Sequence, residues 1–311
     1  MDYKGARVLI TGGAGFIGSN LARRLIADEA EITILDDFST GNMENLEGVK
    51  AEVIHGSVFD KELAKFYVQS SDVVFHLAAK SISASTKNPA DDFETNIGGT
   101  LNILMAMQHP CPFKLVYASS ASVYGNARYL PINEDDAINL LTPYAVSKFA
   151  GEGYCMAFYE SFSIPVIVLR LSNVYGPYQT PANPFCGAIG KFMHSVLHYR
   201  NIIIHGDGLS TRDFTYVSDV VEALYTAGLS KVEGEVFNVA TGIETSVLTV
   251  ADKILQINPD LSIDFIDRRD IDNIRRRVLN IEKIRKRLKW TPKVNLSAGL
   301  INTYNWMRDK I

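Results

Sequence analysis

A tyrosine and a lysine are spaced for proton transfer in the stretch Tyr144-Ala145-Val146-Ser147-Lys148. Pro143 precedes the stretch and suits the first position of a helix, on which residues four apart lie on one face. A tyrosine with its reference pKa of about 10 is a poor base at neutral pH. A neighbouring ammonium group favours the phenolate and lowers that pKa. The pair predicts acid–base chemistry on a hydroxyl group, although many helices carry this spacing without such a role.

A glycine-rich turn, Thr11–Gly18, lies between the apolar run Val8-Leu9-Ile10 and an amphipathic segment. Its glycines, Gly12, Gly15 and Gly18, recur every third residue, and glycine lets a phosphate approach the backbone closely. The helix that follows directs free N–H groups and the positive end of its dipole at that phosphate. This is a GxxGxxG form of the dinucleotide-binding turn. The alternative is a strand–turn–helix corner whose glycines serve packing alone.

An acidic residue, Asp36, ends the next apolar run, Ile32–Leu35. A carboxylate at this place accepts hydrogen bonds from both hydroxyls of the adenosine ribose and repels a 2′-phosphate. No arginine follows at once, because the chain continues as Asp37-Phe38-Ser39. The sequence therefore favours NAD over NADP, and the positive nicotinamide ring would lower the pKa of Tyr144 further.

Short apolar runs alternate with helical patterns over residues 7–120, which implies βαβ units with right-handed crossovers. The expected fold is α/β, a Rossmann-type doubly wound parallel sheet with a smaller C-terminal α/β substrate lobe. Ligands of such sheets bind beyond the carboxyl ends of the strands. Besides the two runs named above, the predicted elements are strands at Ala51–His55, Val73–His76, Lys114–Ala118 and Val166–Arg170, and helices at Lys61–Gln69, Asp91–Gln108 and Tyr144–Phe162.

The pattern becomes less regular after residue 172, where Pro177, Pro181 and Pro184 mark a loop that could cover a substrate. We expect an NAD-binding domain over residues 1–172 and a mainly substrate-binding lobe over 173–311, with the chain crossing back to the sheet near 202–240. The elements predicted there are helices at Ala188–His198, Val217–Leu229, Val247–Ile257, Ile281–Leu288 and Ala298–Met307, and strands at Ile202–His205, Val236–Val239 and Ile263–Ile266.

Composition excludes several classes of function. A net charge of −4 over 311 residues gives no general attraction to nucleic acid or to an anionic membrane, and no apolar run reaches membrane-spanning length. The three cysteines have no CxxC spacing and the six histidines no metal-ligand spacing, so we predict neither a disulfide framework nor a metal site. The basic cluster at 285–289 is interpreted as a solvated helix face, because a nucleic-acid patch would lack a supporting charge and motif. We expect a cytoplasmic protein.

Two predicted helices, Asp91–Gln108 and Tyr144–Phe162, carry apolar residues on more than one face. Such helices need burial on both sides. One side packs on the sheet, and the other is expected to meet a second copy in a two-fold homodimer. The alternative is burial under the C-terminal lobe.

These motifs together resemble those of the extended short-chain dehydrogenases/reductases of the NAD-dependent epimerase/dehydratase family, most closely the UDP-glucose (UDP-galactose) 4-epimerases. The resemblance runs essentially from end to end. Its motifs are TGGAGFIGS at 11–19, DD at 36–37, HLAA at 76–79, TNIGGTLNIL at 95–104, SSASVYG at 119–125, YAVSK at 144–148, RLSNVYGP at 170–177 and GDGLSTRDFTYVSDVVEA at 206–223.

The resemblance implies roles for individual residues. Tyr144 is the expected base, Lys148 holds the nicotinamide ribose and tunes Tyr144, and Ser120 assists. The expected substrate residues are Ser120, Ser122, Tyr144, Asn173, Arg212 as a diphosphate clamp, and Arg269 in a C-terminal motif that departs from the usual R-x-G-D. The expected cofactor residues are Gly12, Gly15, Phe16, Ile17, Asp36, Asp37, Asn42, Ser57, Val58, Leu77, Ala78, Ala79, Lys80, Asn96, Tyr144 and Lys148. Family members often have Gly-Asp where this chain has Gly56-Ser57, so an aspartate contact to adenine is not available there.

The residues after Ser120 discriminate between reactions of the family. Sugar 4,6-dehydratases carry an Asp-Glu pair there and decarboxylases a glutamate, whereas this chain has Ala121 and Ser122. The resemblance therefore implies NAD-dependent epimerisation at C4 of a nucleotide-diphosphate sugar. Another epimerase, dehydratase or reductase acting on a UDP-N-acetylhexosamine or a dTDP-sugar is the alternative. A non-catalytic binding module is a further alternative, but such relatives usually lose the tyrosine or the lysine.

Overall fold

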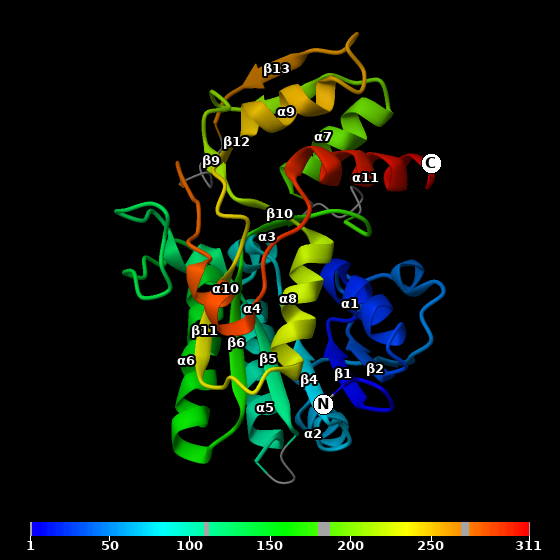
Figure 1. Cartoon of the computed structure of the whole chain (residues 1–311), viewed down its shortest axis with the longest axis vertical. Coiled ribbons are helices and arrows are strands. Elements are labelled where there is room, and N and C mark those ends of the chain that lie inside the picture. Colours follow the sequence, from blue (N-terminus) through cyan, green and yellow to red (C-terminus); the bar gives the residue numbers. More distant parts are fainter. Residues whose placement is uncertain (1, 109–111, 180–186, 269–273, 311) are drawn as a thin grey trace.

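The computed structural model describes residues 2–108, 112–179, 187–268 and 274–310. Its larger lobe is built on one parallel sheet with the strand order β11-β6-β5-β4-β1-β2-β3 (Figure 1). The chain order reverses beside β1, which pairs with β2 on one side and β4 on the other. The strands are β1 (Arg7–Thr11), β2 (Glu31–Asp36), β3 (Glu52–His55), β4 (Val73–His76), β5 (Lys114–Ser120), β6 (Val166–Leu171) and β11 (Glu235–Val239).

Helices cover both faces of this sheet. The apolar side chains of α1 (Phe16–Ile26), α8 (Val217–Leu229) and α10 (Glu282–Leu288) form one core with one face. Those of α2 (Lys61–Gln69), α5 (Gly99–Ala106) and α6 (Pro143–Phe162) form a second core with the other face. Strands β4 to β6 contribute alternate residues to each core, as a strand buried on both sides must. The predicted doubly wound sheet is confirmed.

The helix that carries Tyr144 starts where the sequence signals predict. The Thr142 side chain accepts a hydrogen bond from the N–H of Ala145, and Pro143 occupies the first turn. The helix ends at Ser163, which adopts a left-handed conformation. These two caps fix the register of α6, and so the direction in which Tyr144 and Lys148 point.

The segment predicted as one helix over Asp91–Gln108 is divided. It comprises α4 (Pro89–Asp92), a π-helical stretch η2 (Phe93–Gly98) and α5. A π-helical stretch adds a residue to the turn and re-aims the side chains on it. The apolar periodicity of the sequence does not reveal this switch from α-helix to π-helix, because the apolar pattern continues on both sides of it.

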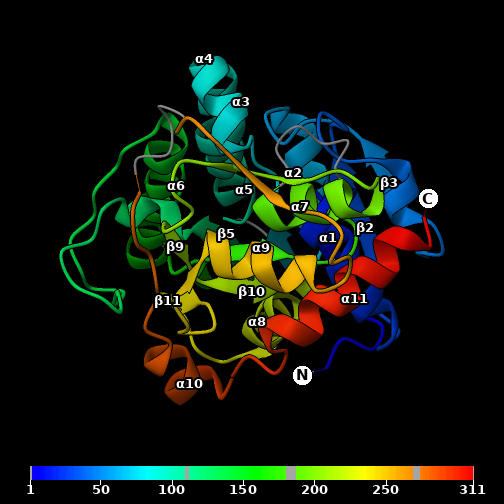
Figure 2. The ribbon, with the colours of Figure 1, turned by 90° about the horizontal axis from the view of Figure 1, so that it is seen from above.

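The smaller lobe lies beyond one end of the sheet, and Figure 2 shows its helices from above. Its core joins α7 (Ala188–Leu197), α9 (Val247–Leu255) and α11 (Leu296–Arg308) with β8 (Ile202–His205), which pairs in parallel with β13 (Ile263–Ile266). Two short ladders connect the lobes: β7 (Asn173–Tyr175) with β10 (Phe214–Tyr216), and β9 (Thr211–Arg212) with β12 (Thr245–Ser246).

The chain then returns to the larger lobe as α8 and β11, where β11 pairs with β6. Of the two strands predicted between 202 and 240, the first thus belongs to the smaller lobe and the second to the main sheet. Among the described residues, no helix combines the length and apolar character that crossing a membrane requires.

Candidate functional site

A cavity of about 330 Å³ lies at the carboxyl ends of β1, β2, β4, β5 and β6. Its volume is in the usual range for a small-molecule site. Side chains far apart in the sequence meet here because the carboxyl ends of parallel strands share one edge of the sheet. Of the predicted site residues, those that line it are Gly12, Gly15, Phe16, Ile17, Asp36, Asp37, Ser57, Val58, Leu77, Ala78, Ala79, Lys80, Ser120, Tyr144 and Lys148.

The glycine turn brings backbone, rather than side chain, to the cavity wall. Gly12 has φ +68°, and a Cβ on it would lie 2.8 Å from Cα of Ala78. A Cβ on Gly18 would lie 2.4 Å from the carbonyl oxygen of Gly12, so the turn and the first turn of α1 pack too closely for any side chain. Helix α1 starts after Gly15 without a side-chain cap, which leaves its first N–H groups for a phosphate. The turn fits a dinucleotide.

The Asp36 carboxylate is buried at the end of β2 and is held by two backbone N–H groups. Its Oδ2 accepts from Ala14 at 2.9 Å and its Oδ1 from Phe38 at 2.8 Å. Burial raises the pKa of Asp36, and the two hydrogen bonds oppose that shift. The carboxylate is therefore fixed in place at the cavity edge, as a ribose-binding group has to be.

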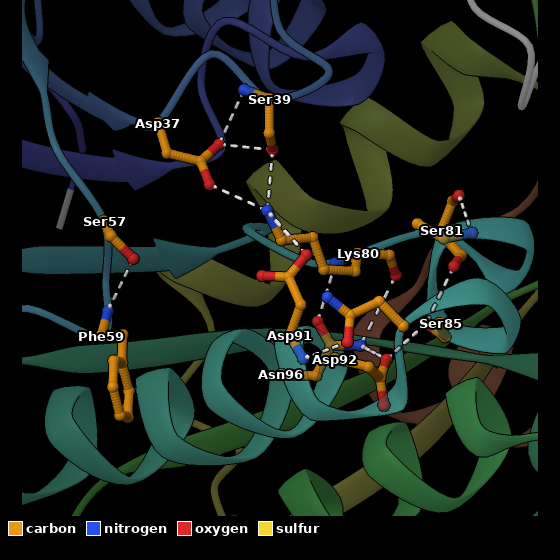
Figure 3. A network of polar contacts seen from close by, with 12 residues as sticks. Asp37, Ser39, Ser57, Phe59, Lys80, Ser81, Ser85, Asp91, Asp92 and Asn96 are labelled. Carbon is orange, nitrogen blue, oxygen red and sulfur yellow. Dashed lines mark hydrogen bonds and ion pairs between the residues drawn. The ribbon is translucent and has the colours of Figure 1, made fainter.

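Lys80 joins two loops across this end of the cavity, as Figure 3 shows. Its Nζ lies 3.1 Å from Asp37 Oδ2 and 3.0 Å from Ser39 Oγ, both on the loop after β2. Asp91 Oδ2 is 3.6 Å away. The lysine itself stands between β4 and α3 (Ile82–Lys87) and its side chain is 11% exposed. The motifs of the sequence predict a cofactor role for Lys80 but give no signal for Ser39, whose contact with Lys80 depends on the fold.

Asn96 lies beneath Lys80 in the π-helical stretch and does not line the cavity. Its Oδ1 accepts from the N–H of Lys80 at 2.8 Å, and its Nδ2 donates to Asp92 Oδ1 at 2.6 Å and to Ser147 Oγ at 3.0 Å. Ser85 also bonds to the buried Asp92 carboxylate. Figure 3 shows Asn96, Asp92 and Ser85 beside Lys80, and Ser147, one residue before Lys148, also donates to Asp92 Oδ1, so the network connects the Lys80 loop to α6.

Tyr144, Lys148 and Ser120 converge on the other half of the cavity. Ser120 accepts from the N–H of Ser122 at 3.1 Å and so caps η3 (Ala121–Tyr124), and its hydroxyl lowers the pKa of the Tyr144 phenol. Lys148 is buried, with Nζ 4.5 Å from the centroid of the Tyr117 ring.

Burial dominates the pKa values of this pair in the ligand-free protein. Burial lowers the pKa of Lys148 to about 8, which nearby acidic groups oppose. Burial also raises the pKa of Tyr144, although the hydrogen bond from Ser120 lowers it. The spacing of Tyr144 and Lys148 predicts that the lysine lowers the pKa of the tyrosine. In the ligand-free protein desolvation of the phenol outweighs any such effect.

The remaining predicted residues lie outside the cavity wall. Asn42 caps η1 (Met43–Leu46) by accepting from the N–H of Glu44 at 3.0 Å. Ser122 is buried behind Ser120. Asn173 and Arg212 stand on the ladders beyond β6, with the N–H of Asn173 bonded to the carbonyl of Asp213 at 3.0 Å. Arg269 is outside the described residues.

One arginine that the sequence analysis did not select is buried next to these ladders. Arg277 is 5% exposed, and among the described residues nothing accepts a hydrogen bond from its Nε or Nη2. Burial, together with the positive charge of Arg212, lowers the pKa of Arg277 to about 9. The sequence shows only a run of three arginines, and nothing in it distinguishes the third from the exposed first two.

A second, larger depression of about 880 Å³ lies in the smaller lobe, between β12 and the start of α11. Its arginines are already paired, Arg275 with Asp207 and Arg276 with Glu244. None of the predicted catalytic residues lines it, so the candidate site is the cavity at the sheet edge. Over the described ranges, no group of three or more His, Cys, Asp or Glu is placed to hold a metal ion.

Comparison with known proteins agrees with this geometry. The family model of the NAD dependent epimerase/dehydratase family matches residues 8–240. A UDP-glucose 4-epimerase of Mycolicibacterium smegmatis is 36% identical over 312 residues, which is 98% of this chain and 99% of that protein. Relatives 33–34% identical also include a UDP-N-acetyl-alpha-D-glucosaminuronate decarboxylase of Bacillus cytotoxicus and a dTDP-D-glucose 4,6-dehydratase of Bos taurus.

Solved structures superpose over nearly the whole chain. A UDP-glucose 4-epimerase of Thermotoga maritima with UDP-glucose has a TM-score of 0.93 at 33% identity, covering 98% of this chain and 99% of that one. A Thermus thermophilus UDP-glucose 4-epimerase in complex with NAD has a TM-score of 0.89 at 32% identity, covering 98% and 100%. The glycine turn, the fixed carboxylate and the tyrosine–lysine pair thus stand in a chain that belongs to the NAD-dependent epimerase/dehydratase family of enzymes, with NAD as its cofactor.

Proposed function

We propose that this protein is a nucleotide-sugar 4-epimerase, which interconverts UDP-glucose and UDP-galactose through a transient 4-keto sugar. The proposal is supported by the meeting of Tyr144, Lys148 and Ser120 beside the glycine turn in one cavity. Relatives named for this reaction match the chain over nearly its whole length.

In the proposed mechanism Tyr144 takes the proton of the sugar 4-hydroxyl, while the Ser120 hydroxyl in the same cavity shares it. NAD, held by the glycine turn and Asp36, would supply the redox chemistry at C4 of the sugar. Tyr144 then gives the proton back to the 4-oxygen. Lys148, which lines the same cavity, stabilises the phenolate in this proposal, and Arg212 holds the diphosphate while the ketone turns over in the site.

The positions of the carboxylates in the cavity bear on which reaction of the family the site supports. Among its described lining residues the carboxylates are Asp36 and Asp37, both at the end of β2, where the adenosine half of the cofactor is expected. The residues that follow Ser120 are the buried Ala121 and Ser122. Elimination or decarboxylation needs an acid and a base beside the sugar, and no carboxylate follows Ser120. Epimerisation needs only the proton relay of Tyr144 and Ser120.

We further propose that the remaining predicted residues act as the family resemblance implies. Ser122, Asn173 and Arg269 contact the sugar nucleotide, and Asn42 and Asn96 support the cofactor site without lining the cavity. The larger lobe, residues 1–172 together with α8 and β11, binds NAD, and the rest of 173–311 mainly binds the substrate.

Incubation of purified protein with UDP-glucose, without added NAD, tests the proposal. UDP-galactose among the separated products is the expected result, because a cofactor regenerated in every cycle needs no external supply. Conversion of UDP-N-acetylglucosamine or dTDP-glucose, with UDP-glucose untouched, would keep the mechanism and change the substrate. An accumulating 4-keto product or net NADH consumption would contradict epimerisation.

We also propose that the protein is a homodimer through the outer faces of α5 and α6. Met105 on α5 is 43% exposed, and Val146 and Tyr154 on α6 are 47% and 39% exposed. The two helices pack against each other, and these side chains point away from the sheet core. The C-terminal lobe leaves them uncovered in the described part of the chain, which favours a second copy as their partner.

A further inference from the structure

Lys148 carries a buried ammonium group, and the acid nearest to it along α6 is bonded elsewhere. The residue is 2% exposed and lines the cavity. A buried charge needs a compensating contact, because burial removes its hydration. Glu152 stands one turn further along the helix, but both of its carboxylate oxygens accept from the Arg170 guanidinium, at 2.7–3.1 Å. Glu152 therefore neutralises Arg170 rather than Lys148.

A second nearby acid, Asp92 at the end of α4, is occupied as well. Its Oδ1 accepts from Asn96 Nδ2 at 2.6 Å and from Ser147 Oγ at 3.1 Å. Asp92 and Glu152 both raise the pKa of Lys148 from a distance, against the larger effect of burial. The direct contact that the ammonium needs comes from a different kind of group.

That group is an aromatic ring. Nζ of Lys148 lies 4.5 Å from the centroid of the Tyr117 ring. This is within the distance of about 6 Å at which the negative face of a ring attracts a cation. The attraction is strongest where both groups are withdrawn from water, and both Lys148 and Tyr117 are buried. The ring thus compensates part of the cost of burying the ammonium.

The ring is fixed against the helix that carries the lysine. The Tyr117 hydroxyl donates to the backbone carbonyl of Lys148 at 3.4 Å. A Cβ on Gly151 would collide with that hydroxyl oxygen, so the glycine provides the space in which the hydroxyl lies. The His76 ring on β4 packs against Tyr117, with centroids 5.7 Å apart. Contacts to one turn of α6 and to β4 therefore set the position of the ring.

The ring packs behind the ammonium and takes no space from a ligand. Lys148 lines the cavity, whereas Tyr117 belongs to the apolar core between the sheet and α6. A ring face attracts the cation as a whole, and an ammonium group has three N–H donors. Donors on the cavity side remain free for the hydroxyl groups of a ligand.

We propose that Tyr117 is a positioning residue, whose ring face holds the ammonium of Lys148 charged and directed into the cavity; this rests on the proposed function for what the ammonium does there, which is to hold the nicotinamide ribose and to stabilise the Tyr144 phenolate. A carboxylate in place of the ring would neutralise the lysine and take up its donors. The ring stabilises the charge and leaves the donors to the ligand.

Other titratable groups around the ammonium are known from the structure. Cys155 and Glu152 on α6 and Asp92 on α4 raise the pKa of Lys148. His76 on β4 is neutral, because burial and then the charge of Lys148 lower its pKa to about 3. A variant that alters only the ring at position 117 leaves all four groups in place. A change in the pKa of Lys148 in such a variant therefore reports on the ring.

The test varies the attraction of the ring for a cation with little change in its size. Tyr117→Phe is the reference, and phenylalanines with increasing ring fluorination then replace it, because fluorine weakens the negative face of the ring. The same series at Phe75, buried on the opposite face of the sheet, is the matched control. Full-length, NAD-loaded proteins are used. The pKa of Lys148 is read from the carbon NMR signal of its Cε, which is assigned by its loss in Lys148→Met.

Fluorination at position 117 should lower the pKa of Lys148 step by step, to about a tenfold weaker proton affinity at the end of the series. The kcat for UDP-glucose at neutral pH should fall in the same order, since less of the lysine is charged. Fluorination at Phe75 should change neither quantity. A pKa of Lys148 that stays constant along the series at position 117 would overturn the inference.

The outcomes separate this inference from the proposed function. A stepwise fall in the pKa of Lys148, with no conversion of UDP-glucose by any of the proteins, would keep the inference and contradict the proposed function. Conversion at one rate along the series, with a constant pKa, would keep the proposed function and overturn the inference.

Thermal unfolding and Tyr117→Leu identify a merely structural role. If the ring acts on the ammonium, Tyr117→Leu lowers the pKa of Lys148 further than any fluorinated ring does, and kcat along the fluorinated series follows that pKa rather than the melting temperature. A lower melting temperature of Tyr117→Leu with an unchanged pKa of Lys148 would show that Tyr117 only fills the core, and would overturn the inference.

Discussion

Lys80 and Asp37 form an ion pair of 3.1 Å that joins the loop after β4 to the loop after β2 (Figure 3). Both residues line the cofactor cavity, and the lysine side chain is 11% exposed and the aspartate 33%. The contact therefore holds together two walls of the cavity, in the part where we propose that the adenosine of the cofactor binds. A partly buried ion pair of this kind is worth about 1 kcal/mol.

Lys80→Met should release NAD faster than the wild type. Loss of about 1 kcal/mol corresponds to about a fivefold higher release rate, and less NAD should remain bound after purification. Stopped-flow displacement and the nucleotide content of the purified protein measure both effects. Lys87→Met, at the exposed end of α3, is the matched control. Unchanged NAD retention in Lys80→Met would show that the ion pair is not part of cofactor binding.

Tyr144→Phe should abolish most of the activity and leave the fold intact. Loss of a general acid–base group costs about 10²- to 10⁴-fold in rate, whereas the phenyl ring keeps the packing of α6. We expect a fall of kcat in this range with NAD content and melting temperature unchanged. Tyr154→Phe, on the exposed face of the same helix, should keep full activity. Near wild-type turnover of Tyr144→Phe would contradict the proposed mechanism.

The buried ammonium of Lys148 should lower the free energy of unfolding of the protein without NAD below pH 8. Burial lowers its pKa from 10.5 in the unfolded chain to about 8 in the folded one. Between these values the unfolded chain binds the extra proton, so the free energy of unfolding rises with pH through this window. Below pH 8 the penalty is complete and amounts to about 3 kcal/mol.

Denaturant unfolding of Lys148→Met at several pH values measures this penalty. The variant should be the more stable protein at pH 7, and its advantage over the wild type should shrink as the pH rises from 8 towards 10.5. A variant that is less stable than the wild type at pH 7 would show that the buried ammonium supports the fold.

The proposed dimer can be tested at Tyr154. A charge on the outer face of α6 cannot be buried against a second copy without a partner, so Tyr154→Glu should shift the protein towards monomer. Light scattering behind size-exclusion chromatography measures the mass. Tyr199→Glu, at an 81% exposed position in the smaller lobe, should leave the mass unchanged. A wild-type protein that elutes as a monomer would contradict the dimer.

The sequence predicts the fold well because its signals are local. Strands of the main sheet such as β1 and β4 contain short apolar runs, and the start signals of α6, Thr142 and Pro143, lie within a few residues of the helix they start. The sheet then brings the ends of these strands together by topology alone. For this reason the order of residues along the chain is enough to assign the glycine turn, Asp36, Ser120 and Tyr144 to one site.

Contacts between distant segments could not be predicted in the same way. Lys80 meets Ser39 only because β4 and β2 flank β1, and the burial of Arg277 depends on a pairing with residues more than sixty positions earlier. The π-helical turn that aims Asn96 at Lys80 leaves the apolar periodicity almost unchanged. Whether the pKa of Tyr144 rises or falls also depends on how deeply the phenol is buried. The four-residue spacing of Tyr144 and Lys148 does not reveal that burial.

The return of the chain to the sheet as β11 has a consequence for the independence of the two lobes. Strand β11 is made from residues that follow the first half of the smaller lobe, yet it covers the edge of β6, whose six residues are all buried. A chain cut at residue 172 would expose that edge, a ready template for pairing with other chains. Residues 1–172 therefore lack a strand that their own sheet uses, and we expect them not to form a stable module without β11.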